Sequence, residues 1–318
     1  MSVLTGPELI DTFASGLQVT RITRQADGRI HWQRTPGVNH RTPYPAVPPG
    51  FAEQAANASD DRVCFATPFD AGPHHTSWHT TGSTTAARAL LSDTVPVRQL
   101  LDVCSALGSR LTVLHGRRAA EPPAAGPQPV GPVPPWLDRL NTWLESGRGP
   151  RASAGFHYRL RSQLGPSRWD SLRDCSRELL RPQEPAATLH GWLTLGSVVL
   201  PDPPGRGRPS TVLSGAEATV GRPEVDLACV IGELEEFRIT ADRLGTDATV
   251  QRSLAAAFLT HYGDGWDRDA VAAGALARIA SHAHDFASYV GWHASLHDYV
   301  PMLADLLDGA GSTVLSDL

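Results

Sequence analysis

The stretch 188-TLHGWLTLGSVVLP-201 decides how this sequence is interpreted. A His-Gly pair, His190 and Gly191, is followed after six residues by the apolar run Val198–Leu200. A short apolar run of this kind favours a buried strand. Between the pair and the run lie Trp192 and Ser197, and the stretch contains no carboxylate. We therefore expect a loop shaped by His190 and Gly191 that leads into a strand.

A second segment, 211-TVLSGAEATVGRPEVDLA-228, belongs with the first. STVLSG reads as another short strand, reached through the loop PDPPGRGRP. A helix is expected to begin near Asp226, because acidic residues are favoured in the first turn of a helix. Asp226 could then brace the His-Gly loop through hydrogen bonds at this helix start.

Length, composition and charge set broad limits. The 318 residues suffice for one large domain or two coupled lobes. A net charge of −5 gives no electrostatic basis for binding nucleic acid or an anionic membrane. The start MSVLTGPELI lacks the features of a signal peptide, and no apolar run reaches about 18 residues. Four widely spaced cysteines favour reduced thiols, so we expect a cytoplasmic protein.

All 28 basic residues are arginine. A GC-rich genome accounts for a scarcity of lysine codons. The complete absence of lysine also has a chemical consequence, because no step of a mechanism can use a lysine ammonium group.

The N-terminal part is expected to contain most of the strands. Residues 17–34 predict a β-hairpin that turns at Asp27-Gly28. Residues 35–60 are rich in Pro, Gly and Asn and are expected to be irregular. A short strand is expected at 62–67, followed by a polar loop over 73–85.

The remainder reads as mainly helical. Apolar residues recur at helical spacing over 95–114, whereas 117–135 forms a Pro-rich, low-complexity loop. Further helices are expected at 136–145, 167–180, 225–237, 249–261, 269–290 and 294–308. The predicted fold class is α+β, with a small β-containing lobe over 1–85 and a larger helical lobe over 86–318.

Together, the two segments resemble the aminoglycoside phosphotransferase family. The shared residues are His190, Gly191, Val198, Val199, Leu200, Gly221, Pro223, Asp226, Leu227 and Ala228. The resemblance implies a protein-kinase-like fold of two lobes, with the catalytic loop at 188–201 and the metal loop at 211–228. It also implies ATP and Mg²⁺ as cofactors, provided that the nucleotide site survives.

The departures from the family pattern fall on its catalytic positions. Trp192 stands in place of the catalytic Asp, which orients the acceptor hydroxyl and accepts its proton. Ser197 and Ser214 stand in place of the Asn and Asp that bind Mg²⁺. Mg²⁺ prefers hard oxygen ligands, and phosphoryl transfer depends on neutralising charge, so these changes argue against ordinary kinase chemistry.

Two residues are candidates to compensate for these losses. Glu217 is the carboxylate nearest to the displaced metal position and could hold a metal or a cofactor. The family's N-lobe lysine has no equivalent, and Arg34 on the second hairpin strand could replace it by position. Arginine is bulkier and presents its donors in a different geometry, so the replacement is not equivalent.

A narrower resemblance is to the kinase-like subunits encoded with class V lanthipeptides and thioamide-containing peptides in actinobacteria. It is carried by Gly215, Glu217, Gly221, Asp226, Gly232, Glu233 and Leu234. It implies phosphorylation of Ser and Thr in a precursor peptide, with a separate lyase that removes the phosphate. The partners implied are therefore a precursor peptide and a lyase-type enzyme.

Three functions remain open from the sequence. The first is a degenerate, pseudokinase-like subunit that binds the peptide, a nucleotide or the partner enzyme without catalysis of its own. The second is an atypical ATP-dependent phosphotransferase that acts on peptide Ser and Thr. The third is a small-molecule antibiotic kinase, which depends most directly on the missing Asp.

Other clusters of polar residues have simpler interpretations. His74, His75 and His79 could bind a metal through imidazoles, but they fit a polar loop better. His293 and His297 are four residues apart on an expected helix and fit ordinary helix histidines. The run Pro203–Pro209 could contact phosphate, but it fits a solvated turn between strands better.

Overall fold

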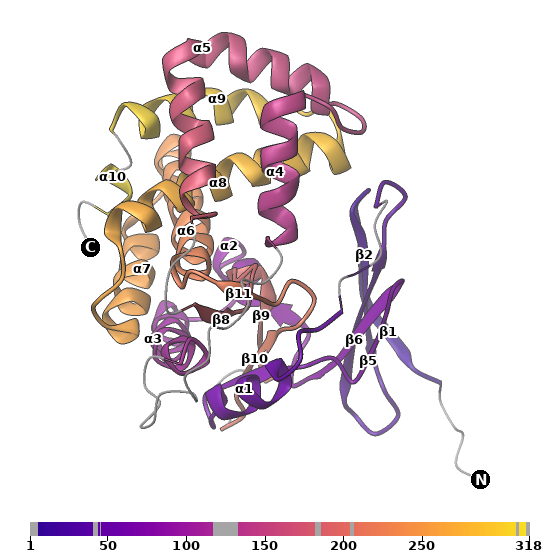
Figure 1. The fold of residues 1–318 in the computed structure, drawn as a ribbon. Coiled ribbons are helices and arrows are strands. Elements are labelled where there is room, and N and C mark those ends of the chain that lie inside the picture. The colour runs from indigo at the N-terminus through magenta and orange to yellow at the C-terminus, as the bar shows by residue number, and fades with distance from the viewer. Residues whose placement is uncertain are drawn as a thin grey trace.

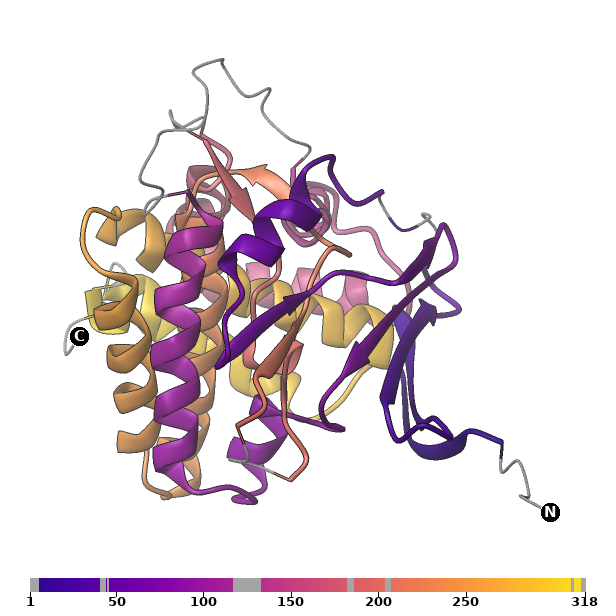
Figure 2. The ribbon, with the colours of Figure 1, turned by 90° about the horizontal axis from the view of Figure 1, so that it is seen from below.

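The computed structural model describes residues 6–40, 44, 46–116, 133–181, 186–203, 207–309 and 312–315. The chain has a small lobe built on an N-terminal β-sheet and a larger lobe of helices (Figures 1 and 2). This arrangement is the α+β, two-lobe fold that the sequence predicts. The strands formed by the segments 188–201 and 211–228, called the diagnostic segments below, lie between the N-terminal sheet and the helices (Figure 1).

The N-terminal sheet is antiparallel and contains the predicted hairpin. Its strand order is β1 (Glu8–Ala14), β2 (Gln18–Arg24), β3 (Ile30–Pro36), β6 (His75–Thr80) and β5 (Asp70–Gly72). β2 and β3 pair in register from Gln18 opposite Pro36 to Arg24 opposite Ile30. Gly28 has a φ of 83°, which the turn between them requires. Strand β1 was not predicted.

The prediction of a polar loop over 73–85 was wrong, because β6 occupies part of it. Trp78 lies opposite Trp32 in the ladder, and both indoles are buried in a small core under the sheet. Thr76, Ser77 and Thr80 of β6 are buried too. The polar sequence of this segment therefore gave no indication of an inner strand. Polar residues can occupy such a strand because its backbone groups are paired on both sides.

The prediction that 35–60 is irregular was also wrong in part, because α1 (Phe51–Ala58) forms there. Phe51, Ala55 and Ala58 are buried along one side of this short helix, which packs on α3. Pro48, Pro49 and Gly50 directly precede it, and such residues usually signal a turn. The burial of Phe51 therefore stabilises a helix that the local sequence does not predict.

The diagnostic segments contribute to two small sheets. One has the order β4 (Val63–Ala66), β10 (Ser210–Leu213), β9 (Val198–Leu200) and β7 (Thr84–Thr85). The other pairs β8 (Ala187–Leu189) with β11 (Thr219–Gly221). The strands predicted at 62–67, at 198–200 and in STVLSG are therefore confirmed, whereas β8 and β11 were missed.

The larger lobe contains most of the helices. They are α2 (Ala86–Leu91), α3 (Val97–Leu114), α4 (Pro135–Ser146), α5 (Ser153–Glu178), α6 (Glu224–Leu244), α7 (Thr249–Tyr262), α8 (Arg268–Asp285), α9 (Leu296–Asp308) and α10 (Ser312–Leu315). A 3₁₀ turn, η1 (Leu195–Ser197), precedes β9, and a π-helical turn, η2 (Phe286–Val290), follows α8. No described helix is long and apolar enough to cross a membrane.

Several predicted helix boundaries need correction. α5 consists of two helical segments that meet at Gly165, directly before Pro166; the second segment matches the helix expected at 167–180, whereas the first, from Ser153, was not predicted. α9 begins at Leu296, so His293 lies before the helix and does not share its face with His297. Most of the Pro-rich loop at 117–135 and residues 204–206 of the turn at Pro203–Pro209 lie outside the described residues. The four cysteines are free, as expected.

Close packing of α3 against α7 gives a test of the fold. A Cβ on Gly108 of α3 would lie 2.1 Å from the carbonyl oxygen of Phe258 on α7. Gly108→Ala should therefore push the helices apart and lower the free energy of unfolding by about 1–3 kcal/mol in urea titrations. Gly155 of α5 is exposed, with its nearest neighbour 3.9 Å from such a Cβ. Gly155→Ala should stabilise by about 0.5–1 kcal/mol, and equal effects of the two changes would contradict this packing.

Candidate functional site

Asp226, at the start of α6, holds the His-Gly loop. Its carboxylate accepts the backbone N–H of His190 at 2.7 Å and that of Gly191 at 2.8 Å. The carboxylate is fully buried and also lies 3.1 Å from Nε2 of His115. Gly191 has a φ of 88°, and a Cβ there would lie 1.9 Å from the carbonyl oxygen of Glu217. Only glycine fits this position, which brings the two diagnostic segments into contact.

The imidazole of His190 joins the same loop to β10. Its Nε2 lies 3.1 Å from the carbonyl oxygen of Leu213, and its Nδ1 lies 3.3 Å from the backbone nitrogen of Trp192. Burial lowers the pKa of His190, although Asp226 opposes this effect. The neutral ring can donate to Leu213 and accept from Trp192, so His190 acts as a structural connection.

A buried charged network supports the loop from behind. The Glu233 carboxylate accepts the backbone N–H of Leu195, and Arg278 lies between Glu233 and Glu236. Glu236 also contacts His282 at 2.7 Å. Burial would raise the pKa of Glu236, but His282 and Arg278 outweigh it and lower that pKa to about 2. This network fixes the position of the loop without facing the cleft.

Trp192 is the residue that the sequence resemblance aligns with the family's catalytic Asp. Its half-buried ring lies 5.3 Å from the ring of Trp136, and the Arg278 guanidinium lies 5.7 Å from its centre. The indole N–H of Trp136 donates to the Gly191 carbonyl at 2.7 Å. Trp192 is therefore packed against the helical lobe and forms part of the cleft wall.

Ser197 and Ser214, which the sequence resemblance aligns with metal-binding residues, direct their hydroxyls into the protein. Ser197 donates to the carbonyl of Thr194 at 2.7 Å and accepts its N–H at 3.2 Å. Ser214 is fully buried and donates to the carbonyl of Val212 at 3.1 Å. Within the described ranges, no cluster of three or more His, Cys, Asp or Glu side chains could hold a metal ion. Neither serine offers Mg²⁺ a charged oxygen, and Glu217 is not part of a cluster of that size.

A cavity of about 210 Å³ lies between the lobes, next to this loop. Its lining includes four of the predicted site residues, namely Arg34, Trp192, Ser197 and Glu217. His190, Ser214 and Asp226 do not line it. For Ser214 this corrects the prediction of a cofactor contact, because its side chain has no exposed surface.

Arg34 and Glu217 face this cavity with unsatisfied polar atoms. The Arg34 guanidinium lies 5.3 Å from the centre of the Trp78 ring, and its Nε has no hydrogen-bond partner among the described residues. The Glu217 carboxyl accepts the backbone N–H of Trp136, but its Oε2 is likewise without a partner there. Burial lowers the pKa of Arg34 and raises that of Glu217.

Three further residues of the cavity were missed by the sequence analysis. Arg139 of α4 pairs with Asp285, at the end of α8, at 3.2 Å. Tyr44 lines the cavity from the N-terminal lobe, and burial raises its pKa to about 12. The sequence carries no signal for the Arg139–Asp285 pair, since 146 positions separate the two residues.

Comparison with solved structures agrees with this architecture. An amicoumacin kinase in complex with AMP-PNP, Ca²⁺ and Ami aligns with a TM-score of 0.53 and 10% identity, over 95% of this chain and 88% of that one. A glucosamine kinase aligns with a TM-score of 0.49 and 15% identity, over 93% of each chain. A macrolide 2′-phosphotransferase from Brachybacterium faecium aligns with a TM-score of 0.43 and 15% identity, over 97% of this chain and 90% of that one.

The fold is therefore that of the kinase-like phosphotransferases. At these identities the similarity establishes the fold alone. No protein-family model and no curated protein sequence matches the chain.

Removing the charge of Asp226 should loosen the loop. Asp226→Asn keeps the shape of the side chain but replaces one acceptor oxygen with an NH₂ group that faces a backbone N–H. Hydrogen bonds to charged groups contribute about 1.5–3 kcal/mol each, so we expect a loss of this order in urea unfolding. The control Asp269→Asn changes an exposed residue in the first turn of α8. A loss no larger than in the control would contradict the role of Asp226.

Asp285 should make unfolding depend on pH in acid. Burial would raise its pKa, but Arg139 and the hydrogen bond with His284 lower it from 3.8 to about 2. Because the folded pKa is depressed, this contribution of roughly 2 kcal/mol is complete above pH ~4 and is lost as pH falls toward ~2. Asp285→Asn should flatten that decline in unfolding titrations between pH 2 and 6. An unchanged slope would show that the pair does not stabilise the fold.

Proposed function

We propose that this protein is a kinase-fold binding subunit that does not carry out metal-dependent phosphoryl transfer. The main support is the arrangement at the two metal positions. The hydroxyls of Ser197 and Ser214 are both hydrogen-bonded to backbone carbonyls, and neither position supplies a charged oxygen. Trp192 contributes an indole where a proton acceptor is needed. The framework that positions the loop is retained, while the groups that perform transfer are absent.

We further propose that the subunit acts in the modification of a peptide natural product. It would hold the precursor peptide, the partner lyase or both during the dehydration of Ser and Thr. Support comes from the resemblance carried by Gly215, Glu217, Asp226 and Glu233. Three of these have defined positions in this molecule, because Asp226 and Glu233 hold the loop and Glu217 lines the cleft.

An atypical phosphotransferase is the second candidate. The observation that favours it is that Arg34 and Glu217 line the same cavity, as a phosphate-binding cation and a metal-binding carboxylate would. Ser197 and Ser214 oppose this role, because neither brings a charged oxygen to the metal beside Glu217. The binding subunit is therefore the better proposal.

Incubation with ATP separates the two candidates. We expect no transfer of labelled phosphate to the precursor peptide encoded beside the gene, with the lyase present or absent. Millimolar ATP and Mg²⁺ should also leave the melting temperature unchanged, whereas a ligand at 100 times its dissociation constant would add about 2.7 kcal/mol. Peptide phosphorylation that disappears in Glu217→Ala would overturn the proposal.

Peptide binding has a separate readout. Anisotropy of a fluorescently labelled precursor peptide should report saturable binding to the wild-type protein. Trp192→Ala should weaken binding at least tenfold, because it removes part of the cleft wall. The control is Trp292→Ala, which removes a half-exposed indole outside the cavity. Equal weakening by both changes would place the peptide elsewhere.

A further inference from the structure

The first segment of α5 and the loop before it form a basic stretch in an acidic protein. Residues 147–165 contain four arginines and no aspartate or glutamate, whereas the whole chain has a net charge of −5. The four are Arg148, Arg151, Arg159 and Arg161. None of them lies within ion-pair distance of a carboxylate in the part of the chain that the structure describes. In the second segment, by contrast, every arginine pairs with carboxylates: Arg168 with Asp308, Arg173 with Asp170, and Arg177 with Glu145 and Asp174.

Two exposed aromatic rings lie among these arginines. Gly155, Tyr158 and Arg159 share one face of α5, because residues three and four apart on a helix are neighbours. The Trp292 ring, from the loop after η2, lies over this face. It is 3.9 Å from the position that a Cβ on Gly155 would take, and its centre is 6.0 Å from the Arg159 guanidinium. Tyr158 is 77% exposed and Trp292 is 49% exposed, so both rings are open to solvent.

Arg151 and Arg161 extend this surface in two directions. Arg151 donates to the Val290 carbonyl at 2.7 Å and to the Asn39 side chain at 3.3 Å, and Val290 itself is exposed. Arg161 lines a groove of about 460 Å³ together with Tyr158, at the kink of α5. The surface is called the arginine–aromatic patch below, and it consists of Arg151, Tyr158, Arg159, Arg161, Val290 and Trp292.

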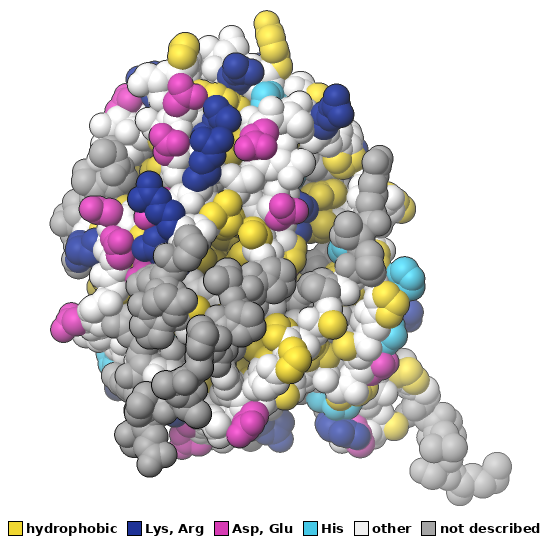
Figure 3. Space-filling view, viewed as in Figure 1, with side chains coloured by type: hydrophobic (Ala, Val, Ile, Leu, Met, Phe, Trp, Pro, Cys, Tyr) yellow, Lys and Arg dark blue, Asp and Glu magenta, His cyan; other side chains and the backbone are white. Residues whose placement is uncertain are grey.

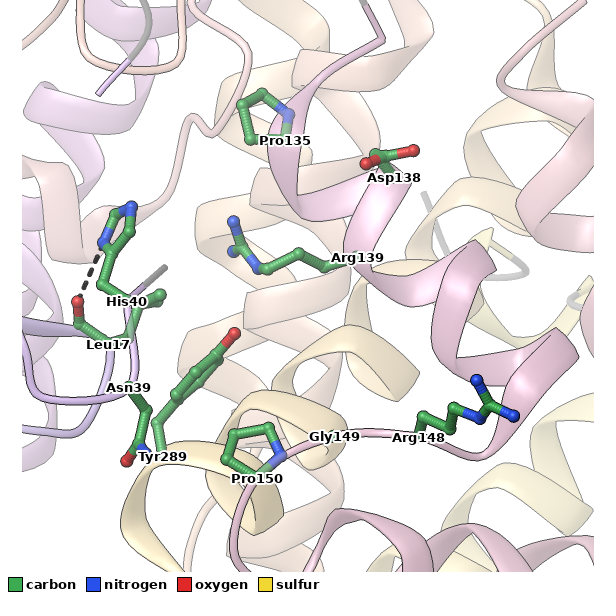
Figure 4. Close-up of a pocket in the computed structure, with 10 residues that line it drawn as sticks. All are labelled: Leu17, Asn39, His40, Pro135, Asp138, Arg139, Arg148, Gly149, Pro150 and Tyr289. Atoms are coloured by element: carbon green, nitrogen blue, oxygen red, sulfur yellow. Dashed lines mark hydrogen bonds between the residues drawn. The ribbon is translucent and has the colours of Figure 1, made fainter. Parts of the chain in front are cut away.

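The arginine–aromatic patch is separate from the interlobe cleft. None of its six residues lines the interlobe cavity or the pocket of about 440 Å³ that Figure 4 shows. Arg148 lies at that pocket, but its side chain extends away from His40 and Tyr289 (Figure 4). In Figure 1, α5 lies at the top of the helical lobe, away from the strands of the diagnostic segments. The patch is therefore a second surface of the molecule.

The groove at the kink provides a place for an anchoring side chain. It lies where Gly165, with a φ of 75°, and Pro166 interrupt α5. A Cβ at Gly165 would meet no atom within 4 Å, so the groove is open there. Pro166 and Trp169 give it apolar walls. Asp170 lines it too, but its carboxylate lies 3.6 Å from Arg173 and is already paired. Interface pockets of this kind hold the aromatic and apolar side chains that contribute most to binding.

We propose that the arginine–aromatic patch docks an acidic segment of a partner protein. Tyr, Trp and Arg are enriched in protein–protein interfaces, whereas Asp and Glu are depleted there, and the patch has this composition. Carboxylates of the segment pair with Arg151, Arg159 and Arg161, because charges across an interface are arranged to be complementary. An aromatic or apolar side chain of the segment enters the groove beside Tyr158.

The charge of the whole molecule favours a protein over a nucleic acid as the partner. A polyanion would be repelled by a chain with a net charge of −5, whereas a short acidic segment needs to meet only the patch. The inference goes beyond the proposed function, which concerns the cleft, because it adds a second binding surface. Its occupant is a partner protein rather than the peptide proposed for the cleft.

The experiment measures binding of a fluorescein-labelled random copolymer of glutamate and tyrosine to the full-length protein by anisotropy, at low and at high salt. The patch variants are Arg161→Gln and Tyr158→Ala. The control is Arg98→Gln, which changes an exposed arginine of α3, at the other end of the helical lobe from α5 (Figure 1). We expect saturable binding to wild type and Arg98→Gln, and weakening of about tenfold in each patch variant. Arg161→Gln should also reduce the salt dependence of binding, because it removes a charge that salt screens.

No binding by the wild type, or equal weakening by Arg98→Gln, would overturn the inference. Polyuridylate that binds as tightly as the copolymer, and through the same residues, would also overturn it, since the patch would then recognise phosphates. Light scattering tests a second copy as the occupant: a wild-type dimer that Tyr158→Ala converts to a monomer would contradict docking of a partner protein. Tyr158 and Arg161 are exposed, so both variants should keep the wild-type melting temperature. Because neither ATP nor the precursor peptide is present, these outcomes are independent of the tests of the proposed function.

Discussion

The cleft depends on the hydrogen bonds that the carboxylate of Asp226 accepts. This carboxylate accepts hydrogen bonds from the two backbone N–H groups of the sharp turn at His190 and Gly191. Buried donors without partners are costly, so the turn and the start of α6 require each other. This turn also lies against the backbone of Glu217, so only glycine fits at position 191. One buried charge therefore links α6, the 188–201 loop and the segment that carries Glu217.

Ser197 and Ser214, which the sequence resemblance aligns with metal-binding positions, are satisfied within their own segments. A carboxylate or an amide at these positions would need partners in the cleft. A serine hydroxyl is satisfied by one nearby carbonyl, and Ser197 and Ser214 each find one within three residues of their own chain. These two hydrogen bonds help to hold the loops in the form that the structure shows. The charged side chains of the helical lobe are mixed in sign on the face that Figure 3 shows.

Two groups of buried charge flank the loop. Behind it, Glu233, Arg278, Glu236 and His282 form ion pairs with one another, although the Nε of Arg278 has no hydrogen-bond partner among the described residues. In front of it, Arg34, Tyr44 and Glu217 have unpartnered atoms beside a cavity. The first group holds the loop in place, and the second lines the cavity.

The sequence by itself determined the elements with strong local patterns. The hairpin at 17–34, the helix at 95–114 and the His-Gly loop all carry periodicity or turn residues that act within a few positions. Four of the residues that it singled out line one cavity: Trp192, Ser197 and Glu217 came from motif spacing, and Arg34 came from its place on the predicted hairpin. Only the tertiary structure decided the rest. Strand β6 and helix α1 form because their buried residues meet distant partners, and Arg139 meets Asp285 across 146 positions for the same reason. Local sequence fixes local conformation, whereas contacts between remote segments arise only when the whole chain packs.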